Sequence, residues 1–213
     1  MNEIHKGGRK SRNWKSGEEI KSKILPANFS APFVIFGGTK SGRKTFALRL
    51  ADMNADKLPE YEAQPFFSSF HIWAARPEET HRTVTLHLMA YIYPPPEKVH
   101  KSYKDQCMAM LDKFCCRVFL FDITSRESFN TARDYMVRYA NNSPVPCFLV
   151  GNKSDLKVSV PQLHIVTREY IEQTIDMTNI KFFECSAKTK LNVQPVLEAI
   201  QDSVNKRKYL MQV

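Results

Sequence analysis

Three short apolar runs in this chain each end in a polar loop motif, and helical patterns separate them. The runs lie at residues 33–36, 147–150 and 180–183, the last of them interrupted by Lys181. Apolar runs of this length are typical of strands buried on both faces of a parallel sheet, and their alternation with helices indicates an α/β fold. Ligands bind such sheets at the carboxyl ends of the strands. We therefore expect the three polar motifs to meet in one crevice.

The rest of the pattern completes the sheet and its covering helices. Further strands are expected at 66–75, 83–88 and 116–121, and helices at 45–53, 103–114 and 167–174. A capping-box pattern at 124–127 begins another helix, and a last amphipathic helix carries Val193, Val196, Leu197, Ile200 and Val204 on one face. Together these elements predict a mostly parallel six-stranded sheet with helices on both faces.

The first motif, residues 38–45, approximates the phosphate-binding pattern G-x-x-x-x-G-K-[ST]. In that pattern backbone N–H groups cradle phosphates, the lysine reaches the β and γ oxygens, and the hydroxyl binds Mg²⁺. Lys44 and Thr45 fit the last two roles, so Thr45 is the candidate metal ligand. The candidate phosphate-binding residues are Gly38, Ser41, Gly42, Arg43, Lys44 and Thr45.

Arg43 stands where this pattern has its second glycine, and Gly42 comes one place earlier. Its charge suits a phosphate, but its bulk is a steric obstacle where the backbone must approach one. If the pattern is aligned to begin at Gly37, both of its glycines are matched, but Arg43 then stands in place of the lysine. We therefore prefer the alignment that begins at Gly38. Alone, the motif is equally consistent with an ordinary glycine turn.

The second and third motifs are Asn152-Lys153-Ser154-Asp155 and Ser186-Ala187-Lys188. Guanine presents two N–H donors side by side, and one ionised carboxylate accepts both, which suits Asp155. An isolated N-K-x-D segment is typical of a solvated turn. The ordered conjunction of all three motifs, each at a strand end, favours a guanine-nucleotide site instead.

The sequence resembles the Ras superfamily of small GTPases, most closely its Ras and Rab branches, over roughly residues 32–208. The stretches that carry the resemblance are GGTKSGRKT, CCRVFLFDITSRESF, LVGNKSDL and ECSAK. It implies a P-loop NTPase G domain that binds GDP or GTP with Mg²⁺. It also implies that Asn152 fixes the loop and contacts the base, that Lys153 lies along the base, and that Asp155 selects guanine. Ala187 would offer its N–H to the guanine carbonyl, with Ser186 and Lys188 holding that loop.

The chain departs from this family where hydrolysis is performed. Such GTPases carry D-x-x-G and a glutamine after the third strand, and a threonine in the first switch loop. Here the first stretch reads MAYIYPPP at 89–96, and no threonine lies between Thr45 and Thr80. Weak or absent GTP hydrolysis is expected, and whether the protein is an enzyme stays open. Tyr91 and Tyr93 are expected at the surface, where they could contact a partner.

Two functional interpretations follow from the resemblance and its departures. The first is a guanine-nucleotide-binding regulatory or scaffold module. The alternative is a nucleotide-free pseudo-GTPase that serves as a structural protein-interaction subunit of a larger assembly, for example a cytoskeletal or ciliary one. The partner would be a protein of unknown identity, and the cytoplasm the expected location, with cytoskeletal or ciliary association compatible with the charge. Five cysteines without a C-x-x-C pair favour a reducing compartment.

The net charge of +9 raises the question of an acidic partner, either an acidic surface or a nucleic acid. Residues 1–30 hold seven basic and three acidic side chains, which predicts a flexible basic tail over 1–31 that could contact an acidic surface. The G domain is expected over 32–209, followed by a short end, 210–213, without a cysteine for lipid attachment. No zinc-finger, RNP or KH pattern accompanies the charge, so specific nucleic-acid binding is not expected.

Overall fold

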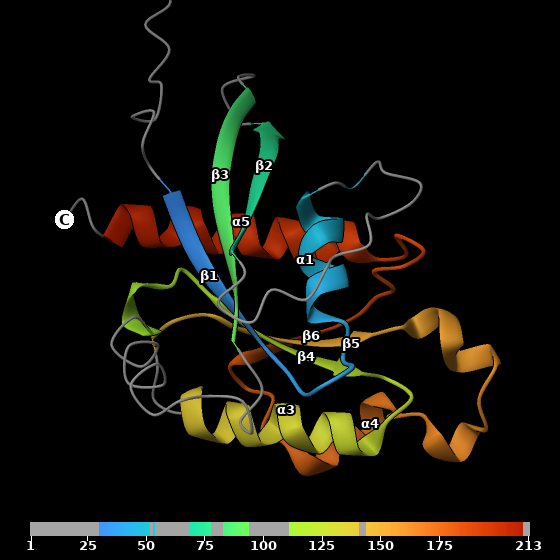
Figure 1. Ribbon diagram of the computed structural model, residues 1–213. Coiled ribbons are helices and arrows are strands. Elements are labelled where there is room, and N and C mark those ends of the chain that lie inside the picture. Colours follow the sequence, from blue (N-terminus) through green and yellow to red (C-terminus); the bar gives the residue numbers. More distant parts are fainter. Residues whose placement is uncertain are drawn as a thin grey trace, which may run out of the picture.

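A six-stranded sheet forms the centre of the protein (Figure 1). This computed structural model describes residues 30–51, 53, 69–77, 83–93, 111–140 and 144–210. The strands are β1 (Ser30–Phe36), β2 (Ser69–Pro77), β3 (Thr83–Ile92), β4 (Arg117–Asp122), β5 (Cys147–Asn152) and β6 (Ile180–Glu184). Their order is β2-β3-β1-β4-β5-β6; β2 pairs antiparallel with β3, and every other pair is parallel. The mostly parallel six-stranded sheet predicted from the sequence is confirmed.

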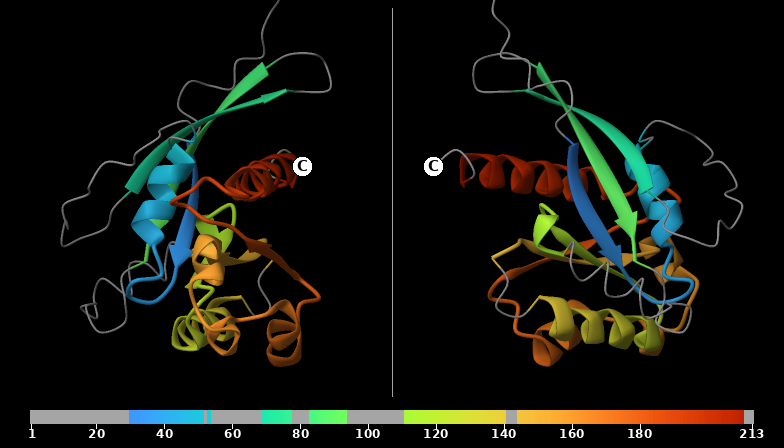
Figure 2. Two further views of the ribbon diagram at one scale, coloured as in Figure 1. Left: turned by 90° about the vertical axis from the view of Figure 1, so that its right-hand side faces the viewer. Right: turned by 60° about the vertical axis from the view of Figure 1, so that its left-hand side comes forward.

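Helices cover both faces of the sheet, as predicted (Figure 2). Helices α1 (Arg43–Ala51) and α5 (Val193–Leu210) pack on one face, and α3 (Arg126–Tyr139) and α4 (Arg168–Thr174) on the other. Short 3₁₀ turns lie at η2 (Leu111–Lys113), η3 (Ser154–Val158) and η4 (Gln162–His164). Since successive side chains of a strand point to opposite faces, β1 contributes to both layers of the core. Phe33 and Ile35 face α1 and α5, whereas Val34 and Phe36 face α3.

The layer beneath α3 is built around a cluster of aromatic rings. Phe36 stacks on Phe119 with ring centroids 5.2 Å apart, and on Tyr139 at 5.0 Å. Tyr93 and Tyr135 close the cluster, with centroids 4.9 Å and 5.5 Å from that of Phe36. Such ring pairs stabilise a core beyond the area that they bury.

Strand β3 is longer than the sequence pattern predicts. The strand expected at 83–88 continues to Ile92 because it pairs in parallel with β1, and Leu88, Ala90 and Ile92 are all buried on one face. The expectation that Tyr93 lies at the surface is wrong: the residue is only 3% exposed and packs within the aromatic cluster. The stretch at 89–93 is therefore strand and core up to the first of three prolines.

Smaller differences concern helix ends. Helix α1 spans Arg43–Ala51, two residues earlier than expected, because the Phe46 N–H already bonds the Gly42 carbonyl at 2.8 Å. Helix α3 is capped by Ser125, whose hydroxyl accepts from the Ser128 N–H, whereas the capping box placed Thr124 in that role. Most of the helix expected at 103–114 lies outside the described residues, as does most of the tail over 1–31.

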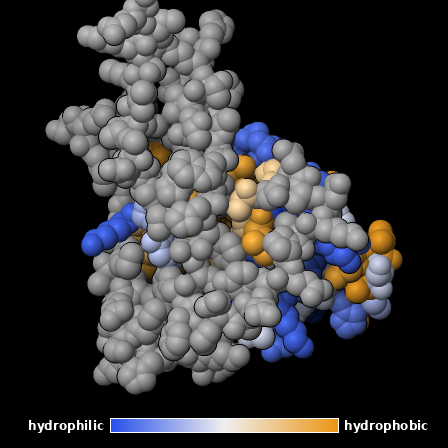
Figure 3. Space-filling model, turned by 45° about the horizontal axis from the view of Figure 1, so that its top comes forward, coloured by the Kyte–Doolittle hydropathy of each residue, from blue (hydrophilic) through white to orange (hydrophobic). Residues whose placement is uncertain are grey.

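Little of the described surface is strongly apolar. In the coloured part of Figure 3, hydrophilic and hydrophobic residues are mixed. Among the described residues, the large apolar side chains with high exposure are Val137, Val158, Leu163 and Leu191. No helix in that part of the chain is both long and apolar enough to cross a bilayer.

The aromatic cluster should dominate the stability of its layer. Phe36 is fully buried, so Phe36→Ala should lower the free energy of unfolding by about 3–5 kcal/mol through lost transfer energy and the cavity left behind. Urea denaturation measures the loss. Val137→Ala, at a position 61% exposed on α3, is the control and should change stability by less than about 0.5 kcal/mol. Equal effects of the two substitutions would contradict the prediction.

Candidate functional site

One buried side chain, Asn152, holds the three sequence motifs together. It is the last residue of β5 and 2% exposed. Its Nδ2 donates to the Ser41 carbonyl at 3.1 Å, and its Oδ1 accepts from the Ala187 N–H at 3.0 Å. The loops that follow β1, β5 and β6 therefore meet at the carboxyl edge of the sheet, which is the convergence expected from the pattern of strands.

The phosphate loop, residues 37–45, is a tight turn that needs glycine at two points. A Cβ on Gly37 would stand 2.4 Å from the Leu120 carbonyl oxygen. Gly42 has a φ of +90°, and a Cβ there would stand 2.5 Å from the Asn152 Nδ2. Ser41 closes the turn by donating its hydroxyl to the Gly38 carbonyl at 3.0 Å. The loop and the amide of Asn152 are thus packed too closely for any side chain between them.

The Arg43 side chain extends from α1 to the residue that follows β3. Arg43 is the first residue of α1, and one of its guanidinium nitrogens donates a hydrogen bond to the carbonyl of Tyr93, just beyond the end of β3. Lys44, partly buried, and Thr45, exposed, follow in the same turn of α1, which contains no acidic residue. The loop therefore gathers positive charge where a phosphate is expected. The sequence identified Arg43 as unusual but could not show that it contacts β3.

Ser186, in the third motif, holds the Asp155 side chain in place. Asp155 lies in η3, where its Oδ1 accepts from the Ser186 hydroxyl at 2.6 Å. The same Ser186 oxygen accepts the Thr189 N–H at 3.1 Å, so the loop over 186–188 and the Asp155 carboxylate are fixed to each other. The resemblance assigns the Ala187 N–H to a guanine carbonyl, but in this structure it donates to Asn152. A base would have to share that N–H in a three-centre bond.

Arg49 is a site residue that sequence analysis missed. Its side chain in α1 is only 1% exposed, and Nε donates to the Ala187 carbonyl at 2.9 Å. Nη2 donates to the Lys188 carbonyl at 3.3 Å, whereas the Lys188 side chain is exposed. These two hydrogen bonds from Arg49 therefore hold the backbone of the 186–188 loop in place. In the sequence, Arg49 is one arginine among the apolar residues of α1. An arginine there is equally consistent with an exposed position on the helix.

Lys153 forms an ion pair inside the site. Its backbone is left-handed, with a φ of 64°, and its Nζ lies 2.6 Å from Oδ2 of Asp122, the last residue of β4. Asp122 also accepts hydrogen bonds from the N–H and the hydroxyl of Thr124, at 3.0 Å and 2.7 Å. Burial alone would raise the pKa of Asp122, but the bonds from Lys153 and Thr124 outweigh it and lower the pKa below its ordinary value.

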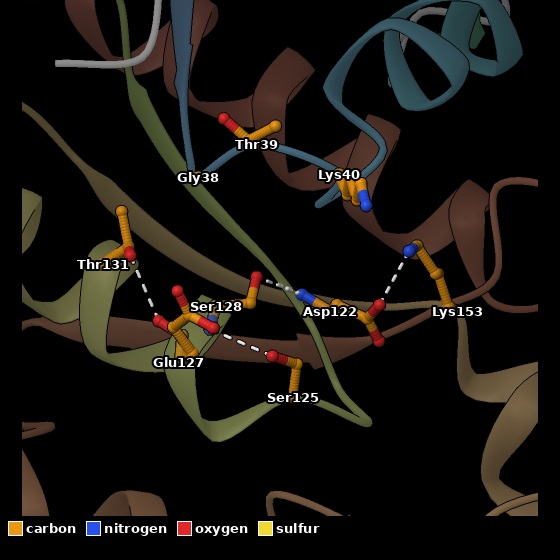
Figure 4. A pocket seen from close by; sticks show the side chains of 9 residues that line it. All are labelled: Gly38, Thr39, Lys40, Asp122, Ser125, Glu127, Ser128, Thr131 and Lys153. Carbon is orange, nitrogen blue, oxygen red and sulfur yellow. Dashed lines mark hydrogen bonds and ion pairs between the residues drawn. The ribbon is translucent and has the colours of Figure 1, made fainter. Parts of the chain in front are cut away.

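A cavity of about 520 Å³ lies between the phosphate loop and the start of α3 (Figure 4). The ion pair of Lys153 and Asp122 forms part of its wall. Its other lining residues are Gly38, Thr39, Lys40, Ser125, Glu127, Ser128 and Thr131. The cavity presents both signs of charge and has the size of a small-molecule site.

The described residues offer few protein ligands for Mg²⁺. This ion needs a near-octahedral set of oxygen ligands, which usually come from one or two carboxylates together with waters and substrate phosphates. The candidate ligand Thr45 has an exposed side chain, and the nearby charged residues of the phosphate loop are all cations. In the part of the chain that the structure describes, no three or more His, Cys, Asp or Glu residues are grouped to hold a metal.

Comparison with known proteins finds similarity to one family. The Ras family model matches residues 100–206, about half of the chain. The Ras-like protein rasB of Dictyostelium discoideum is 36% identical over 97 residues, which is 44% of this chain and 46% of that protein. Ras-related protein Rab-3A of Homo sapiens is 24% identical over 192 residues, covering 83% of this chain and 76% of its own length. GTP-binding protein YPTM1 of Zea mays is 28% identical over 189 residues, covering 82% and 78%.

The family match includes the second and third motifs but not the phosphate loop, which precedes residue 100. The alignment to rasB likewise covers less than half of that relative. The residues that the family model matches include Asn152, Asp155 and the 186–188 loop.

Removing the Asn152 amide should loosen both loops. Asn152→Ala leaves the Ser41 carbonyl and the Ala187 N–H without this partner, so the free energy of unfolding should fall by about 2–4 kcal/mol. Hydrogen exchange should show faster exchange at the Ala187 amide in particular. Gln173→Ala, at an exposed position of α4, is the control and should leave that amide protected. An unchanged Ala187 amide in Asn152→Ala would contradict the arrangement.

The ion pair of Asp122 and Lys153 predicts a pH dependence. The pKa of Asp122 in the folded protein lies below its unfolded value of about 3.9, so the carboxylate stabilises the fold above that pH. This contribution disappears as the pH falls through the folded-state pKa. Asp122→Asn should therefore be less stable than the wild type near pH ~7, and the difference should shrink below about pH 4.

Urea unfolding across a pH series measures this difference. Asp134→Asn, at an exposed position of α3, is the control and should differ from the wild type by less than about 0.5 kcal/mol throughout. A stability gap for Asp122→Asn that stays constant down to about pH 3 would contradict the role given to the carboxylate.

Proposed function

We propose a function from the premise that the chain belongs to the Ras family: it binds GDP or GTP and hydrolyses GTP slowly or not at all. In sequence and fold it is a Ras/Rab-like small GTPase. Within that class it acts as a regulatory or scaffold module through a protein partner. It works in the cytoplasm, without specific nucleic-acid binding.

The observation that carries this proposal is the double contact of Asn152. Its amide ties the phosphate loop to the 186–188 loop, so the phosphate and base ends of a nucleotide face one preformed edge of the sheet. Asp155, held by Ser186, supplies the carboxylate that accepts two neighbouring N–H donors of guanine. Adenine lacks that pair of donors on one edge. Guanine is therefore the preferred base.

Slow hydrolysis follows from missing groups in the sequence. The stretch MAYIYPPP replaces the D-x-x-G segment that holds Mg²⁺ and senses the γ-phosphate in the family that the chain resembles. The described part of that stretch belongs to β3 and the aromatic cluster, which hold it in place. A nucleotide-dependent switch of this segment would have to break core packing. We infer a steady nucleotide-bound state rather than a rapid cycle.

The second candidate is a nucleotide-free pseudo-GTPase in a larger assembly. The bond from Arg43 to the Tyr93 carbonyl favours it, because the positive charge of the loop already has a protein partner. In that case the fold would serve as a structural subunit, for example of a cytoskeletal or ciliary complex. The basic residues before Pro32 would then contact an acidic surface.

Nucleotide content separates the two candidates. We expect the purified protein, denatured and analysed by chromatography, to release guanine nucleotide, and added GDP or GTP to raise the thermal unfolding temperature. Asp155→Asn replaces an acceptor with a donor and should weaken GDP binding by about 10–100-fold. Asp176→Asn, at an exposed turn, is the control and should bind as the wild type. No released nucleotide and no thermal shift would favour the pseudo-GTPase.

A further inference from the structure

The Lys153 side chain runs from the end of β5 to the end of β4, beside the phosphate loop. Its Nζ lies 2.6 Å from Oδ2 of Asp122, the last residue of β4 (Figure 4). On the way, its Cε stands 3.9 Å from the place that a Cβ on Gly42 would take. The side chain is 29% exposed and lines the cavity beside that loop. Lys153 therefore forms part of the wall of the crevice.

The ion pair with Asp122 fixes where this side chain lies. Lysine has a flexible four-carbon stem, so its many rotamers must be restricted by a partner. The backbone of Lys153 is left-handed, a conformation that residues other than glycine keep only where surrounding contacts hold it. Among the described residues, its ammonium pairs with Asp122.

Asp122 is itself firmly held. Its Oδ1 accepts the N–H and the hydroxyl of Thr124, at 3.0 Å and 2.7 Å, which leaves Oδ2 for Lys153. The N–H of Asp122 donates to the Ser128 hydroxyl at 2.9 Å, at the start of α3. The Asp122 side chain is only 15% exposed. A well-ordered carboxylate thus sets the position of a long and otherwise flexible lysine.

We propose that Asp122 is a positioning residue for guanine-nucleotide binding: it holds Lys153 in the conformation in which the nucleotide contacts that side chain, without touching the nucleotide itself. The inference rests on the proposed function, since it concerns the same crevice. An ammonium has three N–H donors, so Lys153 can bind Asp122 and a ligand oxygen together. Because the lysine is already ordered, less side-chain entropy is lost when the ligand binds.

Two roles for Asp122 predict opposite effects on nucleotide affinity. If the carboxylate acted through its charge alone, its removal would strengthen binding, because a negative charge beside the crevice repels the phosphates. If the carboxylate positions Lys153, its removal weakens binding. The direction of the change therefore distinguishes the two roles.

The experiment measures the GDP affinity of the full-length protein with MgCl₂ at neutral pH, after removal of any bound nucleotide. Asp122→Asn keeps an oxygen for Thr124 but loses the charge that binds Lys153, and should weaken GDP binding by about 5–20-fold. Lys153→Met keeps an apolar stem and should weaken binding by a similar factor. In the Lys153→Met protein, Asp122→Asn should change the affinity by less than about 2-fold, because Asp122 acts through Lys153.

Asp134→Asn removes an exposed carboxylate of α3 and is the matched control, which should bind GDP as the wild type does. Thermal unfolding without nucleotide establishes that each variant is folded. If Asp122→Asn is not, Thr124→Val removes the hydroxyl that donates to Oδ1 and gives the same comparison in both backgrounds.

Unchanged or tighter GDP binding by folded Asp122→Asn would overturn this inference alone. So would an equal loss of affinity from Asp122→Asn in the wild-type and Lys153→Met proteins, because a general structural defect would act in both. No GDP binding by the wild type would overturn the proposed function, and this inference with it.

Discussion

The site depends on one primary amide, that of Asn152. A side-chain amide offers both a donor and an acceptor, and Asn152 uses the donor on the Ser41 carbonyl and the acceptor on the Ala187 N–H. A carboxylate in its place would lack the donor, and an apolar side chain would lack both. Because the residue is buried, either change would leave a polar group unsatisfied. The spacing between the loop after β1 and the loop after β6 is therefore set by this side chain.

Much of the fold was predictable because its signals are local. The apolar runs of β1, β4 and β5 are buried on both faces, so their composition alone marks them and their ends. β6, at the edge of the sheet, is only partly buried. The end of β3 was not predictable in the same way. Tyr91 and Tyr93 before three prolines look like a loop, and only pairing with β1 and contact with Phe36 make them strand and core. Tertiary packing overrides local pattern there.

In the candidate site, too, local features could be predicted from the sequence and long-range contacts could not. Residue types and spacing at strand ends predict which loops meet, but they do not predict where a long side chain points. The contacts of Arg43 with Tyr93, of Arg49 with Ala187 and of Lys153 with Asp122 join positions 50, 138 and 31 residues apart in the chain. Each depends on the completed sheet. Arginine and lysine have many rotamers, so sequence alone leaves their partners open.

The separation of these contacts along the chain also bears on when the site forms. Asn152 bonds Ser41 across 111 residues, so this contact needs β1, β4 and β5 to be aligned first. A chain with only its local helices formed has no such crevice. Any ligand of this site would thus bind the native state alone and shift the folding equilibrium toward it in proportion to its concentration. The concentration of such a ligand would therefore help to set how much of the chain is folded.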